Sequence, residues 1–183
     1  MKRAEMQNDL AMTVGLVSAS MLFVTLLMGY GIYRSSAPAW PPAGFNPVSL
    51  LWPVISTLII FVSSWFCHQV VIALRANNFA SAHKHLNITI ALGVGFMCSQ
   101  LTLWADLKQT GLFVSSGIYS SILYGFTWIH AAHVIGGLLT LIYLKMVMKP
   151  ATRLVQQKAR NVEKFWHFLG LVWAVMFIVL FAV

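Results

Sequence analysis

The hydrophobic positions of this sequence gather into five long runs, separated by short segments that are richer in polar residues. The runs cover residues 10–33, 48–74, 86–107, 119–147 and 162–183. About 20 apolar residues in helical form cross the roughly 30 Å hydrocarbon layer of a bilayer, because every backbone amide then finds its partner within the segment. The pattern predicts an all-α, polytopic membrane bundle, with five transmembrane helices in one domain over residues 1–183.

The segment after the first run supports this boundary. It reads RSSAPAWPPAGFNP and contains four prolines, which remove backbone donors and end a helix near Arg34. At the start of the fifth run, Asn161 is a candidate N-cap, and Glu163 would then lie in the first turn of that helix.

Composition excludes an ordinary soluble domain. Residues of the apolar set make up 59% of the chain and charged residues 9%, whereas soluble domains carry about 25% charged residues. The net charge of +8 comes from cations that lie mostly between the apolar runs. Their loop positions, rather than binding to nucleic acid, explain this charge.

The cations also predict an orientation, since Lys and Arg collect on the cytoplasmic side of membrane proteins. With the N-terminus inside, only Arg34 and Lys108 lie on the opposite side. We therefore expect a cytoplasmic N-terminus and a C-terminus on the other side. The cations that this orientation places inside are Lys2, Arg3, Arg75, Lys84, Lys145, Lys149, Arg153, Lys158, Arg160 and Lys164.

Histidines are the candidates for chemistry within the runs, because ionisable groups at membrane depth are costly and need an explanation. His68 lies in the second run, His130 and His133 in the fourth, and His167 in the fifth. His130 and His133 share a helix face with Gly137, which is compatible with a haem or copper site if another helix supplies a ligand. The alternative is that these side chains are neutral and hydrogen-bonded to neighbouring helices or lipid.

Other ligand types do not complete a metal site at helical spacing. Methionines are scattered, and Cys67 lies on a different face from His68; no CxxC motif is present. No acid lies in the middle of a predicted span, which argues against a proton pump within this chain. Glycines in the third, fourth and fifth runs predict close helix contacts, with the third and fourth helices at the packed centre.

The order of the motifs resembles subunit III of the haem-copper oxidases over roughly the whole chain. After Arg34, Ala37, Trp40, Pro41 and Pro42 come GFMCSQLTLWADLKQTGLFVSSGIYSSILYGFTWIHAAHVIGG from Gly95 and FWHFLGLVW from Phe165. The residues that match the family pattern are Gln100, Trp104, Thr127, His130, His133, Trp166 and His167. The resemblance implies roles in packing and lipid contact for these residues, and we add Glu163 as a candidate of the same kind.

The resemblance implies the five-helix bacterial form of cytochrome c oxidase subunit III, in the inner membrane. Such a subunit has no catalytic centre, metal or other redox cofactor of its own. It packs against subunit I, which carries the haems and copper, and it binds phospholipid while oxygen reduction is coupled to proton pumping.

Three positions depart from the family pattern. The first helix has Ser18, Ser20 and Met21 near the place of a common carboxylate, Trp128 replaces a glycine after the threonine, and Gly170 replaces an aspartate after WHF. The missing acids weaken any carboxylate-dependent role in proton uptake.

Three alternatives stay open on the sequence. The chain could be an accessory subunit associated with nitric oxide reductase, a subunit of a quinol oxidase, or a stand-alone b-type cytochrome anchor that uses His130 or His133. The basic cytoplasmic face, including Arg153, Lys158 and Arg160, further predicts binding of anionic lipid, against the alternative that these charges only orient the helices.

Overall fold

Five long helices dominate the structure, a computed structural model that describes residues 2–40, 49–148 and 153–182. A one-turn 3-10 helix, η1, precedes α4, and a π-helical turn, η2, follows α5. Each of the five is long and apolar enough to cross a membrane, and no strand occurs within these ranges. The prediction of an all-α polytopic membrane bundle is confirmed. The helices are α1 (Lys2–Ser36), α2 (Leu51–Arg75), α3 (Phe79–Gln109), η1 (Val114–Ser116), α4 (Ile118–Val147), α5 (Arg153–Phe177) and η2 (Ile178–Ala182).

α1, α3 and α5 begin before their apolar runs, because hydrogen bonding within a helix continues where its side chains become polar, whereas α2 begins at Leu51, inside its run. α3 begins at Phe79, where the Asn78 side chain accepts a hydrogen bond from the Ser81 amide at 3.0 Å. α5 begins at Arg153. The prediction that Asn161 caps the fifth helix is therefore wrong, and Glu163 does not lie in its first turn. Most of the proline-rich segment, residues 41–48, lies outside the described residues.

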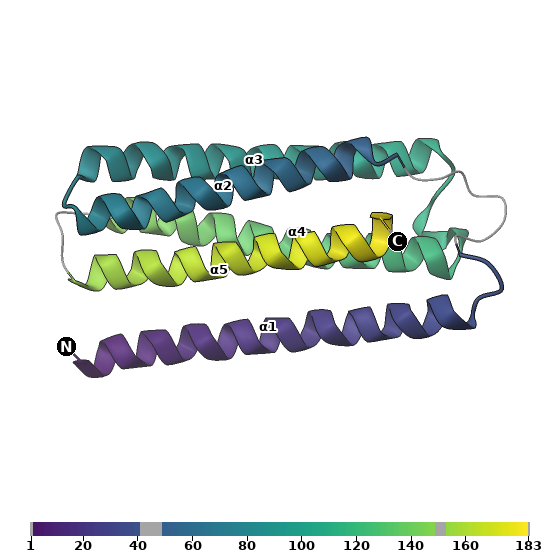
Figure 1. The fold of residues 1–183 in the computed structure, drawn as a ribbon, viewed down its shortest axis with the longest axis horizontal. Coiled ribbons are helices and arrows are strands. Elements are labelled where there is room, and N and C mark those ends of the chain that lie inside the picture. The colour runs from purple at the N-terminus through teal and green to yellow at the C-terminus, as the bar shows by residue number, and fades with distance from the viewer. Residues whose placement is uncertain (1, 41–48, 149–152, 183) are drawn as a thin grey trace.

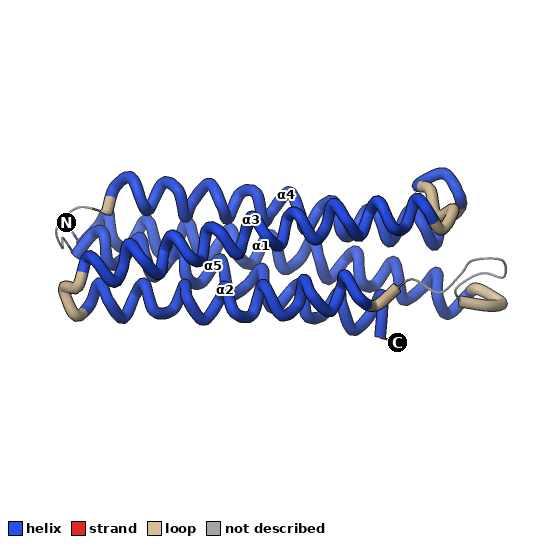
Figure 2. The backbone as a smooth tube through the Cα atoms, turned by 90° about the horizontal axis from the view of Figure 1, so that it is seen from above, coloured by secondary structure: helices blue, strands red, loops and turns tan. Residues whose placement is uncertain are grey.

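The helices run up and down in chain order, so the start of α1 lies at the same end as the α2–α3 connection (Figure 1). α2 packs along α3, and α5 contacts α2, α4 and α1. Figure 1 shows α1 at the edge of the assembly, and Figure 2 shows that all five helices run along the same long axis. The prediction that the third and fourth helices form the centre is wrong, because α5 is the helix that joins the other parts.

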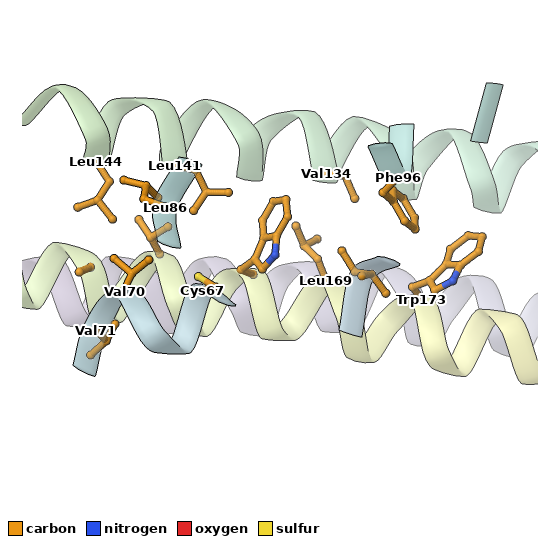
Figure 3. Packing of buried hydrophobic residues seen from close by; sticks show 14 of the residues in the cluster. Cys67, Val70, Val71, Leu86, Phe96, Val134, Leu141, Leu144, Leu169 and Trp173 are labelled. Atoms are coloured by element: carbon orange, nitrogen blue, oxygen red, sulfur yellow. The ribbon is translucent and has the colours of Figure 1, made fainter. Parts of the chain in front are cut away.

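The core lies between α5 and the helices around it (Figure 3). Trp166 and Trp173 of α5 are fully buried, and the Trp173 indole meets the Phe96 ring of α3 edge-on at 5.1 Å. Leu141 and Leu169 fill the space between α4 and α5.

Two glycines allow this packing. A β-carbon at Gly93 would lie 2.7 Å from Leu138 Cδ2 and 2.9 Å from Trp166 Cη2, and one at Gly137 would lie 2.9 Å from Trp166 Cζ3. Gly95 and Gly136 have no such neighbour within 4 Å. The expectation of close glycine contacts is correct only for the glycines that face α5 or α2.

Candidate functional site

A large cleft lies between α1 and the α4–α5 pair, with a volume of about 1050 Å³. Its walls are mostly apolar side chains, and α1 contributes small residues such as Gly15 and Ala19 that leave space open. Further lining residues are Ala11, Met12, Leu16, Leu22, His133, Leu144, Leu154, Val162 and Phe165. A long apolar cleft of this kind fits an acyl chain better than it fits a polar substrate.

The cleft has a polar end near the beginnings of α1 and α5. Lys158 donates a hydrogen bond from Nζ to the Tyr143 hydroxyl at 2.9 Å, and the same ammonium lies 4.9 Å from the centre of the Tyr143 ring. The Asn161 amide reaches the Asn8 carbonyl oxygen at 3.5 Å. A positive charge therefore lies at one end of an apolar space, as the binding of an anionic lipid requires.

A smaller pocket of about 290 Å³ lies close by and is lined by Arg75, Arg153 and Arg160 together with Asp9, Gln156 and Gln157. The three guanidinium groups come from α2 and α5, so the pocket exists only because the two helices are side by side. Gln156 connects the same helices by donating to the Leu74 carbonyl oxygen at 3.3 Å. Guanidinium groups arranged around one space are suited to a phosphate.

The predicted polar residues of α3 and α4 form hydrogen bonds between helices. Gln100 is fully buried and donates to the Ser56 hydroxyl of α2 at 2.9 Å. Trp104 donates from Nε1 to the Thr127 hydroxyl of α4 at 3.0 Å, and Thr127 in turn donates to a backbone carbonyl of its own helix. These contacts join α3 to its two neighbours.

His130 and His133 lie one turn apart in different surroundings. His130 is fully buried, with its ring between those of Phe23, Phe96 and Trp173. His133 lines the cleft, and its ring lies 5.3 Å from that of Phe23. The structure brings neither ring next to His68 or His167, which instead lie beside each other. No imidazole pair for a haem bridging helices therefore forms around His130.

Trp166 joins three helices. Its Nε1 donates to the Ser63 hydroxyl of α2 at 3.1 Å, while its ring fills the space that Gly93 and Gly137 leave in α3 and α4. This placement agrees with a packing role.

Sequence reasoning missed a cluster of three ionisable side chains. His68 of α2 lies with its Nδ1 2.6 Å from Oε1 of Glu163, and His167 Nε2 lies 3.7 Å from the same oxygen. Spacing along one helix could have paired Glu163 with His167, which are four residues apart. It could not reveal His68, because only packing brings α2 against α5.

Comparison with known proteins identifies the family of this chain. The family model for cytochrome c oxidase subunit III matches residues 4–183. This chain is a member of the cytochrome c oxidase subunit III family. Among its relatives is cytochrome c oxidase subunit 3 of Synechocystis sp., which is 34% identical over 91% of this chain and 71% of its own length.

Two further relatives carry the same subunit name. The protein of Thermostichus vulcanus is 29% identical over 94% of this chain and 85% of its own length, and the probable subunit of Mycobacterium bovis is 30% identical over 92% and 84%. Cytochrome c oxidase is an oxidoreductase complex, so membership implies association with other oxidase subunits.

The family name also gives a context for the departures from its pattern. Near the place in the first helix where the resemblance leads us to expect a carboxylate, Met21 is exposed and Ser18 lines the cleft. Gly170 packs with its α-carbon facing Ser64 of α2, where an added β-carbon would be 3.3 Å from the serine oxygen. The glycine found where the resemblance leads us to expect an aspartate therefore lies at a close contact between α5 and α2.

Proposed function

We propose that this chain is a non-catalytic subunit III of a haem-copper terminal oxidase in the bacterial inner membrane. In this role it packs against the catalytic subunit, holds phospholipid, and supports oxygen reduction coupled to proton pumping. The N-terminus lies on the cytoplasmic side, and all 183 residues form one transmembrane domain. The observation that carries the proposal is the apolar cleft with Lys158 at its polar end and the arginine-lined pocket close by, in a chain of the subunit III family.

Lipid binding follows from the chemistry of the two cavities. The acyl chains lie along α1 and α4, and the phosphate lies near Lys158 or among the arginines of the smaller pocket. A cation at the membrane surface contributes about 1 kcal/mol to the attraction of anionic lipid. The cations of this end therefore hold the headgroup while the cleft removes the acyl chains from the bulk bilayer.

Contact with the catalytic subunit is supported by the outer face of α2. Leu58, Phe61 and Trp65 are large apolar side chains that remain exposed, Trp65 by 56%. In a membrane such a face packs against lipid or against another membrane protein. The bulky tryptophan is of the type that anchors protein interfaces.

The chain itself is proposed to carry no haem or copper. The rings that enclose His130 leave its imidazole no open side for an iron porphyrin, which argues against His130 as the haem ligand of a stand-alone b-type cytochrome. Electron transfer and oxygen reduction are assigned to the partner subunits.

Purification of the tagged chain from its native membrane tests the assignment to an oxidase. We expect a haem-copper catalytic subunit to copurify, identified by mass spectrometry and by its haem spectrum. The same preparation distinguishes cytochrome c from quinol as electron donor by assay of both. Recovery with a nitric oxide reductase, or a Soret band from the isolated chain, would contradict the assignment.

Native mass spectrometry tests the lipid sites. Replacement of Arg153, Lys158 and Arg160 by glutamine removes cations that line the two cavities, and we expect a loss of most of the retained phosphatidylglycerol or cardiolipin. The control replaces Lys84 and Lys145, which are exposed and line neither cavity. Equal lipid retention in both variants would show that these charges serve only to orient the helices.

A further inference from the structure

The cluster of His68, Glu163 and His167 brings together three ligand atoms from two helices. One nitrogen from each histidine and one oxygen of Glu163 all lie within 4.8 Å of one another. The shortest separation is 2.6 Å, between His68 Nδ1 and Glu163 Oε1, and His167 Nε2 is 3.7 Å from the same oxygen. The two imidazole rings are 6.4 Å apart at their centres.

The distances between these ligand atoms are close to the distances between the ligand atoms of a zinc site. Zinc binds imidazole nitrogen and carboxylate oxygen at about 2.0–2.2 Å, so ligand atoms on a tetrahedron lie about 3.3–3.5 Å apart. The observed distances of 2.6 and 3.7 Å lie on either side of this value. The two histidine nitrogens lie within 4.8 Å of each other. Side-chain rotations would bring all three ligand atoms to the separations that the ion requires.

The type of ligand also matters. Two imidazoles and one carboxylate suit a borderline ion such as Zn²⁺, whereas Mg²⁺ and Ca²⁺ prefer oxygen ligands. Three protein ligands leave a fourth position for water. The exposed fractions of the side chains, 52% for His68 and 43% for His167 against 14% for Glu163, place this fourth position on the open side of the cluster.

The position of the cluster along the helices makes an ion accessible. It lies beside Lys164, which is exposed, and about two turns from the level at which Gln156 meets Leu74. The basic end of the bundle is the end that we propose to face the cytoplasm. An ion can therefore reach the cluster from the aqueous phase without crossing the centre of the bilayer.

The charge of the cluster gives a further reason. A carboxylate at membrane depth is costly unless a cation compensates it, and the two histidines are neutral unless protonated. A divalent ion would neutralise Glu163 and tie α2 to α5, which are also joined by Trp166 and Gln156.

We propose that His68, Glu163 and His167 form a binding site for one Zn²⁺ ion that bridges α2 and α5. None of these three residues lines the lipid cleft, and the proposal does not depend on the proposed function. The ion has a structural role, since its ligands come from α2 and α5 and hold these two helices together.

The test uses the full-length chain in detergent with an affinity tag that lacks histidine. Titration with Zn²⁺ should give one site per chain by calorimetry. Co²⁺ in place of Zn²⁺ should give the intense visible d–d bands of a four-coordinate ion, and Zn²⁺ should raise the thermal unfolding midpoint of the chain. We expect His68→Ala, Glu163→Gln and His167→Ala each to weaken binding at least tenfold and to remove the Co²⁺ bands.

His83→Ala is the matched control, because His83 is a partly buried histidine of α3 outside the cluster. It should leave affinity and spectrum unchanged. Circular dichroism checks that each variant keeps its helices, and Glu163→Gln preserves side-chain shape if an alanine variant does not fold. The proposal is overturned if no stoichiometric site is found, or if Zn²⁺ binds Glu163→Gln and His83→Ala equally well.

Discussion

The bundle of α2 to α5 and the single helix α1 are both apolar, but they are held in different ways. The most apolar 18-residue stretch of α1 has the highest mean hydropathy among the five helices. It is nevertheless the least buried within the protein, with 11% of its residues buried against 33–44% in the other helices. The bundle is joined by buried tryptophans and by hydrogen bonds between helices. α1 is attached at separate points, through Asn8, Phe23 and Tyr30.

This difference between α1 and the bundle shows that the hydropathy of a helix indicates how well it is solvated by lipid. It does not indicate how much of the helix is buried against other helices. In a membrane, apolar side chains lose little by facing lipid, so packing depends on shape and on polar contacts. The bundle has glycines beneath indole rings and a Gln100–Ser56 bond, whereas the described face of α1 toward the cleft has small side chains and open space. We propose that lipid acyl chains occupy the open space between α1 and the bundle.

Among the variants that test this comparison, we expect Trp166→Ala, in the bundle of α2 to α5, to lower the free energy of unfolding the most. The indole is fully buried between three helices, so its removal leaves a large cavity and takes away the hydrogen bond that Trp166 donates to the Ser63 hydroxyl. We expect a loss of about 3–5 kcal/mol in the free energy of unfolding, measured by denaturant titration in detergent. Trp65→Ala is the control, since Trp65 is exposed and should cost far less in the isolated chain. Equal losses would mean that the bundle is not held by the Trp166 contact.

Phe23→Ala should release α1 from the bundle at its midpoint. Phe23 is 3% exposed and packs against the rings of His130 and His133. We expect a cost of about 3 kcal/mol, at the low end for a buried phenylalanine, because one helix rather than the whole core loses its contact. Met21→Ala, at a position that is 67% exposed, is the matched control.

Spin labels can show that this loss comes from α1. With one label on α1 at Val17, a second on α4 at Leu139 and Cys98 replaced by serine, Phe23→Ala should broaden the distribution of distances between the labels. All three positions are exposed, so labelling itself leaves the contacts intact. A narrow and unchanged distribution would show that α1 is fixed by its other contacts.

A smaller effect is expected from Gly93→Ala. The new methyl group would overlap Leu138 and the buried indole of Trp166, and such overpacking costs about 1–2 kcal/mol. Gly95→Ala adds the same atom two residues away, where no atom lies within 4 Å, and should be neutral or slightly stabilising. Thermal unfolding of the two variants measures the difference. A destabilised Gly95→Ala would indicate a helix effect unrelated to packing.

The sequence selected several residues of the site without their partners. The resemblance to subunit III implied packing or lipid contact for Gln100, Trp104, Thr127 and Trp166, and the structure shows these residues in hydrogen bonds between helices. The start of α5 was not predicted correctly, because the polar residues after Arg153 continue a helix that hydropathy ends at residue 162. This error moved Glu163 from the interior of a helix to its first turn.

The neighbours of Glu163 could not be found from the sequence. His68 is far from it along the chain, and its apolar surroundings on α2 resemble those of every other face of that helix. The same reason hides the cleft, since α1 has no polar stripe that marks where it leaves the bundle.

The sequence by itself determined the five membrane helices, the charge difference between the two ends and membership of the subunit III family. These follow from local properties, because a helix in lipid must satisfy its own backbone within about 20 residues. Only the tertiary structure decided that α5 lies at the centre, that α1 stands off to form a cleft, and that three ionisable side chains meet. Those outcomes depend on the fit of side-chain shapes between helices, for which apolar faces of similar composition give no separate signal.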